Sequence, residues 1–221
     1  MPKCVMGLGL ALLLLGTGCS DSSKDLSSSD PGERAAALRK MAAAGDDKAA
    51  EQVAPLIKHE DTRTATQAIE TLGRMSSGRA CEYLRDVMTS EQRPELRRAA
   101  VASLARRKEA QAAEAIRQAV ARDPSPEVRS MAAMSLVRTG NVEDVNVLAN
   151  AAVAEPDPQV AQSEVTAMGA LMGVRFAYDP AATPEARKAN LARIRAAAAE
   201  LAQAKKNGRP AGFSCKHTPS R

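Results

Sequence analysis

Residues 125–136, with the sequence SPEVRSMAAMSL, decide the fold. Ser125 suits the N-cap of a helix, Pro126 suits its first turn, and Glu127 complements the positive end of the helix dipole. Small and apolar residues then recur at the spacing of one helical face. They are Val128, Met131, Ala132, Ser135 and Leu136. Gly140 predicts the end of this helix, because glycine tolerates the left-handed conformation found at helix exits.

A second helix is predicted over about residues 142–154, and the resulting helix pair repeats along the chain. Several positions recur with a period of 32 residues, which indicates a repeated structural unit. They include Leu72, Leu104, Leu136 and Met168, then Ala68, Ala100 and Ala132, and also Pro94, Pro126 and Pro158. The units are expected at about 31–60, 61–92, 93–123, 124–157 and 158–205. The absence of tryptophan and the presence of only two tyrosines and two phenylalanines also favour closely packed helices. We therefore predict an all-α fold, an α-solenoid of about five helical hairpins within residues 31–205.

The pattern Asp-x-x-x-Glu-Val-Arg-x-x-Ala-Ala-x-x-Leu, between Asp123 and Leu136, resembles HEAT repeats. It is particularly similar to the short HEAT-like units first named from phycobilisome lyases. The resemblance covers roughly residues 31–170 and implies stacked hairpins whose second helices line the concave side and face a partner. Because the repeat residues are those that make helices stack, the resemblance says more about fold than about function.

The last unit departs from the repeat after residue 173. An aromatic-Asp-Pro segment containing Phe176 and Tyr178 leads into a final helix that begins near Thr183. This resembles the closing segment of some bacterial HEAT-repeat proteins. The two aromatic side chains are expected to cover the open end of the array, with a ligand pocket as the alternative.

The N-terminus has the features of an export signal. Lys3 precedes an apolar run from Val5 to Leu15, which is too short to span a bilayer as a helix. Residues 15–19, LGTGC, resemble the bacterial lipobox, in which the cysteine, here Cys19, is acylated. Residues 1–18 are therefore predicted to be a lipoprotein signal peptide and residues 19–30 a flexible tether. The predicted location is exported and lipid-anchored at the cell or outer membrane. The motif usually has leucine where this chain has Gly16, so an unacylated secreted protein is the alternative.

The positive charge of the chain is concentrated near its C-terminus. Five basic residues and no acidic one lie within residues 205–221, which predicts a basic disordered tail over residues 206–221. Those five and Lys3 account for six of the 31 basic residues, which leaves 25 against 26 acidic ones. A nearly neutral body with few aromatic residues argues against a nucleic-acid partner.

Residues for catalysis or metal binding are scarce. His59 and His217 are the only histidines, and the chain has no paired His/Cys spacing and no glycine-rich phosphate loop. We therefore expect no enzyme activity, no cofactor, no metal and no small-molecule substrate. The resemblance leaves a bilin-lyase type of chromophore-handling enzyme as the alternative, although those lyases act in the cytoplasm. Cys81 is expected to be a small buried residue, with a Cys81–Cys215 disulfide as the alternative.

Candidate partner-binding residues are polar positions that share a register in the predicted second helices. They are Glu82, Arg85, Asp86, Glu114, Arg117, Gln118, Asn146 and Asn150. The alternative is an ordinary solvated face, with Glu82–Arg85 and Glu114–Arg117 pairs along the helices. An open solenoid exposes a large grooved surface, so the leading hypothesis is a non-catalytic scaffold that binds a protein or peptide of the cell envelope.

Overall fold

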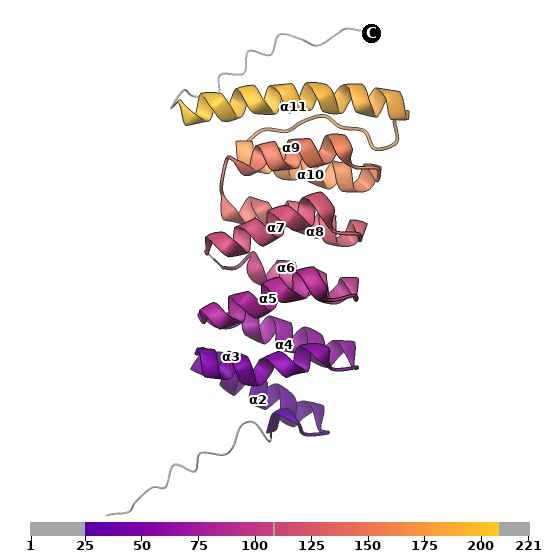
Figure 1. The fold of residues 1–221 in the computed structure, drawn as a ribbon. Helices are drawn as coiled ribbons and strands as arrows, with labels where there is room; N and C mark the ends of the chain where they lie inside the picture. The colour runs from indigo at the N-terminus through magenta and orange to yellow at the C-terminus, as the bar shows by residue number, and fades with distance from the viewer. Residues whose placement is uncertain (1–24, 108, 208–221) are drawn as a thin grey trace, which may run out of the picture.

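A computed structural model describes residues 25–107 and 109–207, and the description below is confined to them. The chain forms five successive helical hairpins stacked into an elongated array (Figure 1). The pairs are α2 (Pro31–Ala44) with α3 (Asp47–Val53) and the 3₁₀ helix η1 (Ala54–Lys58); α4 (Thr62–Arg74) with α5 (Gly78–Ser90); α6 (Pro94–Leu104) with α7 (Ala110–Arg122); α8 (Pro126–Leu136) and the 3₁₀ helix η2 (Val137–Thr139) with α9 (Asp144–Ala154); and α10 (Pro158–Met172) with α11 (Pro184–Lys206). The predicted all-α solenoid is confirmed.

The helices form two layers. The first helices of successive hairpins, from α2 to α10, pack on one another, and α3, α5, α7 and α9 do the same in the second layer (Figure 1). We call the exposed side of α3, η1, α5, α7 and α9 the second-helix face. No helix in the described part of the chain is both long enough and apolar enough to cross a membrane.

The repeated leucine register forms the centre of the core. Leu72, Leu104, Leu136 and Met168 are almost fully buried, as their spacing predicts. Cys81 is also buried, with a free thiol whose pKa is raised by desolvation. The expectation that Cys81 packs as a small core residue is confirmed, whereas Cys215 lies outside the described residues.

Local capping agrees with the sequence at most helix starts. Asp61 and Asp157 accept hydrogen bonds from backbone N–H groups of α4 and α10. Gly140 has φ of 65° after η2, as its place at a helix exit predicts. The prediction for Ser125 is wrong in one respect: it occupies the N-cap position, but its hydroxyl donates to Glu127 instead of accepting from the backbone.

The C-terminal end of the array is closed by α11, which packs mainly on α9 (Figure 1). Phe176 and Tyr178, in the connection between α10 and α11, lie half-buried against the core, as expected for residues that cover an open end. This connection approaches α10 closely at Gly169, because a Cβ atom there would lie 2.6 Å from the carbonyl oxygen of Val174. The last unit therefore depends on a small residue at this position.

The N-terminal side differs from the expected tether. A flexible segment was predicted up to residue 30, but Leu26 is buried in the core and the Arg34 guanidinium donates to the carbonyl of Ser28. Lys40 also forms an ion pair with Asp25. The physical reason is the apolar side chain of Leu26, because its burial in the core stabilises an ordered conformation of this segment. Cys19 and nearly all of the predicted basic tail lie outside the described residues, although α11 includes Lys206.

One acidic side chain lies in the core of the array. Glu164 on α10 is fully buried, and neither of its carboxylate oxygens has a hydrogen-bond partner. Desolvation raises the pKa of Glu164 from 4.5 to about 8, with a smaller contribution from the nearby Glu155 carboxylate. Glu164 therefore carries a proton at neutral pH.

Candidate partner-binding face

Three adjoining grooves run along the second-helix face, each between neighbouring helices of that layer. The N-terminal groove lies between η1 and α5, the middle groove between α5 and α7, and the C-terminal groove between α7 and α9. Their volumes are 640, 740 and 510 Å³ respectively. This row of grooves repeats with the helical hairpins.

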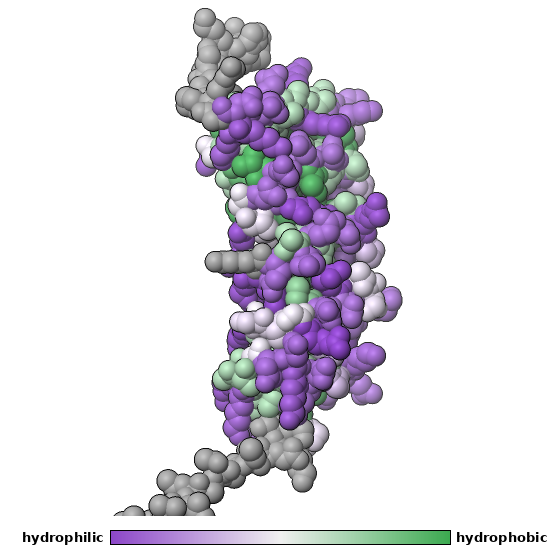
Figure 2. Space-filling view, turned by 60° about the vertical axis from the view of Figure 1, so that its left-hand side comes forward, coloured by the Kyte–Doolittle hydropathy of each residue, from purple (hydrophilic) through white to green (hydrophobic). Residues whose placement is uncertain are grey.

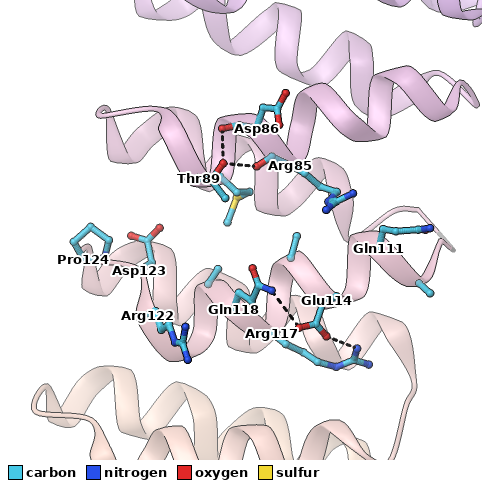
Figure 3. Close-up of a pocket in the computed structure, with 14 residues that line it drawn as sticks. Arg85, Asp86, Thr89, Gln111, Glu114, Arg117, Gln118, Arg122, Asp123 and Pro124 are labelled. Carbon is cyan, nitrogen blue, oxygen red and sulfur yellow. Dashed lines mark hydrogen bonds and ion pairs between the residues drawn. The ribbon is translucent and has the colours of Figure 1, made fainter.

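The middle groove brings together five of the predicted site residues. Arg85 and Asp86 come from α5, and the other three come from the facing side of α7 (Figure 3). Those three are Glu114, Arg117 and Gln118. Figure 3 shows Arg85 extending from α5 towards α7. The helical repeat thus places polar side chains from two consecutive units around one groove.

The remaining predicted residues are more dispersed. Asn150 lines the C-terminal groove, while Glu82 and Asn146 are exposed but line none of the three grooves. The expected Glu82–Arg85 pair is wrong, because Glu82 pairs with Arg79 at 2.9 Å instead. Arg79 sits between Glu82 and Glu51 of the preceding hairpin, and two acceptors hold its guanidinium there.

Arg117 has a structural as well as a surface role. Its Nε donates to Asp144 at 2.6 Å, and an Nη donates to Glu114 at 3.4 Å, as the expected i,i+3 pair. Asp144 is fully buried and also accepts from the hydroxyl of Thr139. Hydrogen bonding to Asp144 raises the pKa of Arg117 further, so the guanidinium stays charged. Replacing Arg117 would therefore disturb the fold as well as the groove.

A repeated set of buried ion pairs fixes the C-terminal ends of the second helices. Arg97 on α6 donates two hydrogen bonds, at 2.8 and 2.9 Å, to Asp123, the C-cap residue of α7. It also donates to the carbonyls of Glu91 and Gln92 at the end of α5, at 2.9 and 3.0 Å. One guanidinium therefore links the ends of two consecutive second helices.

The same arrangement recurs 32 residues later. Arg129 on α8 donates to Glu155, the C-cap residue of α9, at 2.7 and 2.8 Å, and to the carbonyl of Asp123 at 2.9 Å. The Asp123 and Glu155 side chains are each 3% exposed, so both pairs are largely shielded from water. We call these two pairs the arginine ladder. It sets the spacing of α5, α7 and α9, and therefore the shape of the middle and C-terminal grooves.

The surface outside the grooves is mainly hydrophilic. Figure 2 shows one side of the array, on which hydrophobic side chains form only small separate patches. Among the described residues, the exposed large hydrophobic side chains are Met134 and Val153. No group of histidine, cysteine, aspartate or glutamate side chains suited to a metal ion is found within residues 25–107 and 109–207.

Some groove residues were not predicted. Gln111 and Arg122 line the middle groove, and Tyr83 and Lys58 line the N-terminal groove. The predicted residues share registers with polar residues of other units, whereas Arg122 has Ser90 and Ala154 as its counterparts. Its place on the last turn of a second helix is the one signal that points to it.

These features define an α-solenoid of repeated helical hairpins with a grooved second-helix face. Two overlapping stretches of the chain, residues 24–105 and 86–169, match the family model for HEAT repeats. Together they cover about two thirds of the chain, which belongs to the HEAT-repeat family. HEAT repeats commonly serve as scaffolds for protein interaction. A comparison with curated proteins finds no match.

Proposed function

We propose that this protein is a non-catalytic scaffold that binds a partner protein of the bacterial cell envelope on its second-helix face. The observation that carries the proposal is the row of three open grooves, which share rim residues and run across α5 and α7. Polar groove side chains such as Arg85, Gln118 and Asn150 are exposed and have no role in holding the core. A repeated array of this kind offers an extended surface to a partner.

Bulky substitutions in the grooves are expected to abolish partner capture. The blocking variant Gln118→Trp/Asn150→Trp fills the middle and C-terminal grooves without changing a charge. The control variant Gln159→Trp/Thr166→Trp also replaces two exposed neutral residues with tryptophan, both on α10 in the first-helix layer. Each full-length protein is cross-linked in envelope fractions, and the captured proteins are quantified by mass spectrometry.

The blocking variant should recover at least about tenfold less of any partner captured by the wild type, since buried contacts at a groove centre dominate binding. The control variant should recover the wild-type amount. Equal recovery by the two variants would place the binding surface elsewhere and reject the proposal.

We also propose that acylated Cys19 anchors the protein in the envelope membrane. Support comes from the apolar run of residues 5–15 and from the lipobox-like residues 15–19. Asp25, the first described residue, lies at the end of the array opposite α11 (Figure 1). An anchor before Asp25 would hold that end near the membrane and leave the second-helix face accessible along the side of the array.

Cys19→Ala is expected to abolish incorporation of labelled palmitate and to move the protein from the membrane fraction to the soluble fraction. Its helical circular dichroism should match that of the wild type, because all the described helices of the array lie after residue 24. Ser20→Ala serves as a matched control that retains the label. Palmitate labelling of the Cys19→Ala protein would contradict the anchor.

A further inference from the structure

We infer that the partner contributes an extended acidic segment, with an acidic side chain in the middle groove and a small apolar side chain in the C-terminal groove. This inference rests on the proposed function and names the chemistry of the partner. Three observations support it: the adjacency of the grooves, the charge left unpaired in the middle groove, and the small apolar side chains that line the C-terminal groove. The usual spacing of packed helices then gives the register of the segment.

The grooves adjoin one another across α5 and α7. Asp86 and Thr89 of α5 line both the N-terminal and the middle groove, and Arg122 and Asp123 at the end of α7 line both the middle and the C-terminal groove. A chain that leaves one groove therefore crosses a single helix before it enters the next. This geometry suits an extended segment better than a single helix lodged between two ridges.

The middle groove has cationic groups for which no acidic partner is found within residues 25–107 and 109–207. Glu114 is paired with Arg117, and the Asp123 carboxylate is held by Arg97 of the arginine ladder. By contrast, Arg85 and Arg122 are exposed and form no ion pair with the described residues.

Asp86 is the one groove carboxylate for which no ion pair is found among those residues, so the described lining contains two unpaired guanidinium groups and a single unpaired acid. Carboxylates of a partner complement this excess of unpaired positive charge. Each planar guanidinium group can bind a carboxylate through two hydrogen bonds.

The C-terminal groove has a different lining. Its walls include small apolar side chains, among them Val120, Ala121, Val147 and Ala151. Of its charged side chains, Arg129 is paired with Glu155 and Asp123 with Arg97, and Arg122 lies at the boundary with the middle groove. A small aliphatic side chain is the kind of group that can leave water and enter such a groove at the lowest cost in free energy.

The distance between the grooves gives the sequence spacing of the partner. Packed helices lie about 8–10 Å apart, and a polyproline II segment advances about 9.3 Å in three residues, returning a side chain to the same face. An acidic residue in the middle groove therefore places the residue three positions away in the C-terminal groove. A polyproline II segment has no internal hydrogen bonds, and the amides of Gln118 and Asn150 can bond to its backbone.

The test is a selection of displayed random 12-residue peptides against the full-length protein. The expected result is enrichment of aspartate or glutamate three positions from alanine, valine or proline. Synthetic versions of the selected peptides are then titrated against the wild type and two charge-reversed variants. Arg85→Glu/Arg122→Glu should weaken binding at least about tenfold, whereas the control Arg63→Glu/Arg98→Glu, on the first-helix layer, should change it less than about twofold.

Selection of basic or purely apolar peptides, failure to select any peptide, or equal weakening by the two variants would overturn the inference. So would dimerisation of the wild type that Arg85→Glu/Arg122→Glu abolishes, because the occupant would then be a second copy. Loss of partner capture in the blocking variant without selection of acidic peptides would leave the proposed function standing while rejecting the acidic segment.

Discussion

Replacing Glu164 with glutamine is expected to stabilise the protein at pH 8 and to remove a large pH dependence of its unfolding free energy. The folded-state pKa of Glu164 is about 8, against 4.5 for an unperturbed carboxyl. Between these two pH values the unfolded chain loses the proton and the folded chain keeps it. The free energy of unfolding of the wild type therefore falls as pH rises from about 4.5, and the loss is complete above pH 8.

The expected size of this effect approaches 5 kcal/mol, because each pKa unit corresponds to about 1.4 kcal/mol. The positive charge of Arg129 lowers the pKa of Glu164, but it is the smallest of the three contributions, and Arg129 is already paired with Glu155 at the end of α9. Burial without a partner is therefore the dominant cause.

The measurement is urea unfolding of the wild type, Glu164→Gln and Glu164→Ala between pH 5 and 8. Glu164→Ala restores the residue found at the corresponding positions Ala68, Ala100 and Ala132, so it should also be more stable than the wild type at pH 8. The exposed Glu114→Gln serves as the control and should keep the wild-type slope. The same slope in Glu164→Gln as in the wild type would show that Glu164 is not buried as described.

Replacing Arg97 with alanine is expected to destabilise the protein by about 3–5 kcal/mol. The substitution leaves Asp123 charged in a position where its side chain is 3% exposed, and it frees the carbonyls of Glu91 and Gln92. Removing one partner of a buried ion pair has a cost of this size, because the remaining charge is desolvated without compensation.

Chemical unfolding of Arg97→Ala, Asp123→Ala and the double variant measures this coupling. The double variant should lose less stability than the sum of the single variants, since each single change leaves the other partner unpaired. The neighbouring exposed Arg98→Ala should stay within about 0.5 kcal/mol of the wild type. If Arg97→Ala is no more destabilising than Arg98→Ala, the arginine ladder does not hold the second helices in place.

Most of the fold was predictable because stacking residues recur at fixed spacing. The register of Leu72, Leu104 and Leu136 identifies the core, and Pro126 and Gly140 mark where a helix begins and ends. The packing of Leu26 was not predictable in the same way, since it lies in a serine- and aspartate-rich segment of the kind that usually stays flexible.

The buried polar groups were harder to predict. Asp123 and Glu155 each precede a proline, and no ion pair was predicted for either, although their 32-residue spacing matches that of Arg97 and Arg129. Glu164 is also unusual in its register, because the corresponding residue in each of the three preceding units is alanine. A sequence pattern shows that such a residue is unusual, but only packing shows that no partner reaches it.

The equivalent positions of the second helices could be predicted from the sequence, but which of their side chains are exposed could not. Arg85, Arg117 and Ala149 share a register, yet the first is exposed, the second is half-buried and the third is buried. The helix pairs differ in their turns and in what they bury, and Asp144 draws Arg117 towards the core. Equivalent positions in successive repeats therefore do not have equivalent exposure.

The claim that the second-helix face binds a partner protein is tested most directly by photo-cross-linking from single positions. A photoreactive phenylalanine analogue replaces Gln118 in the middle groove or, in a separate protein, Thr166 on the first-helix layer. Binding on the second-helix face predicts a cross-linked partner from position 118 and none from position 166. Cross-linking of the same partner from position 166, with none from position 118, would contradict it.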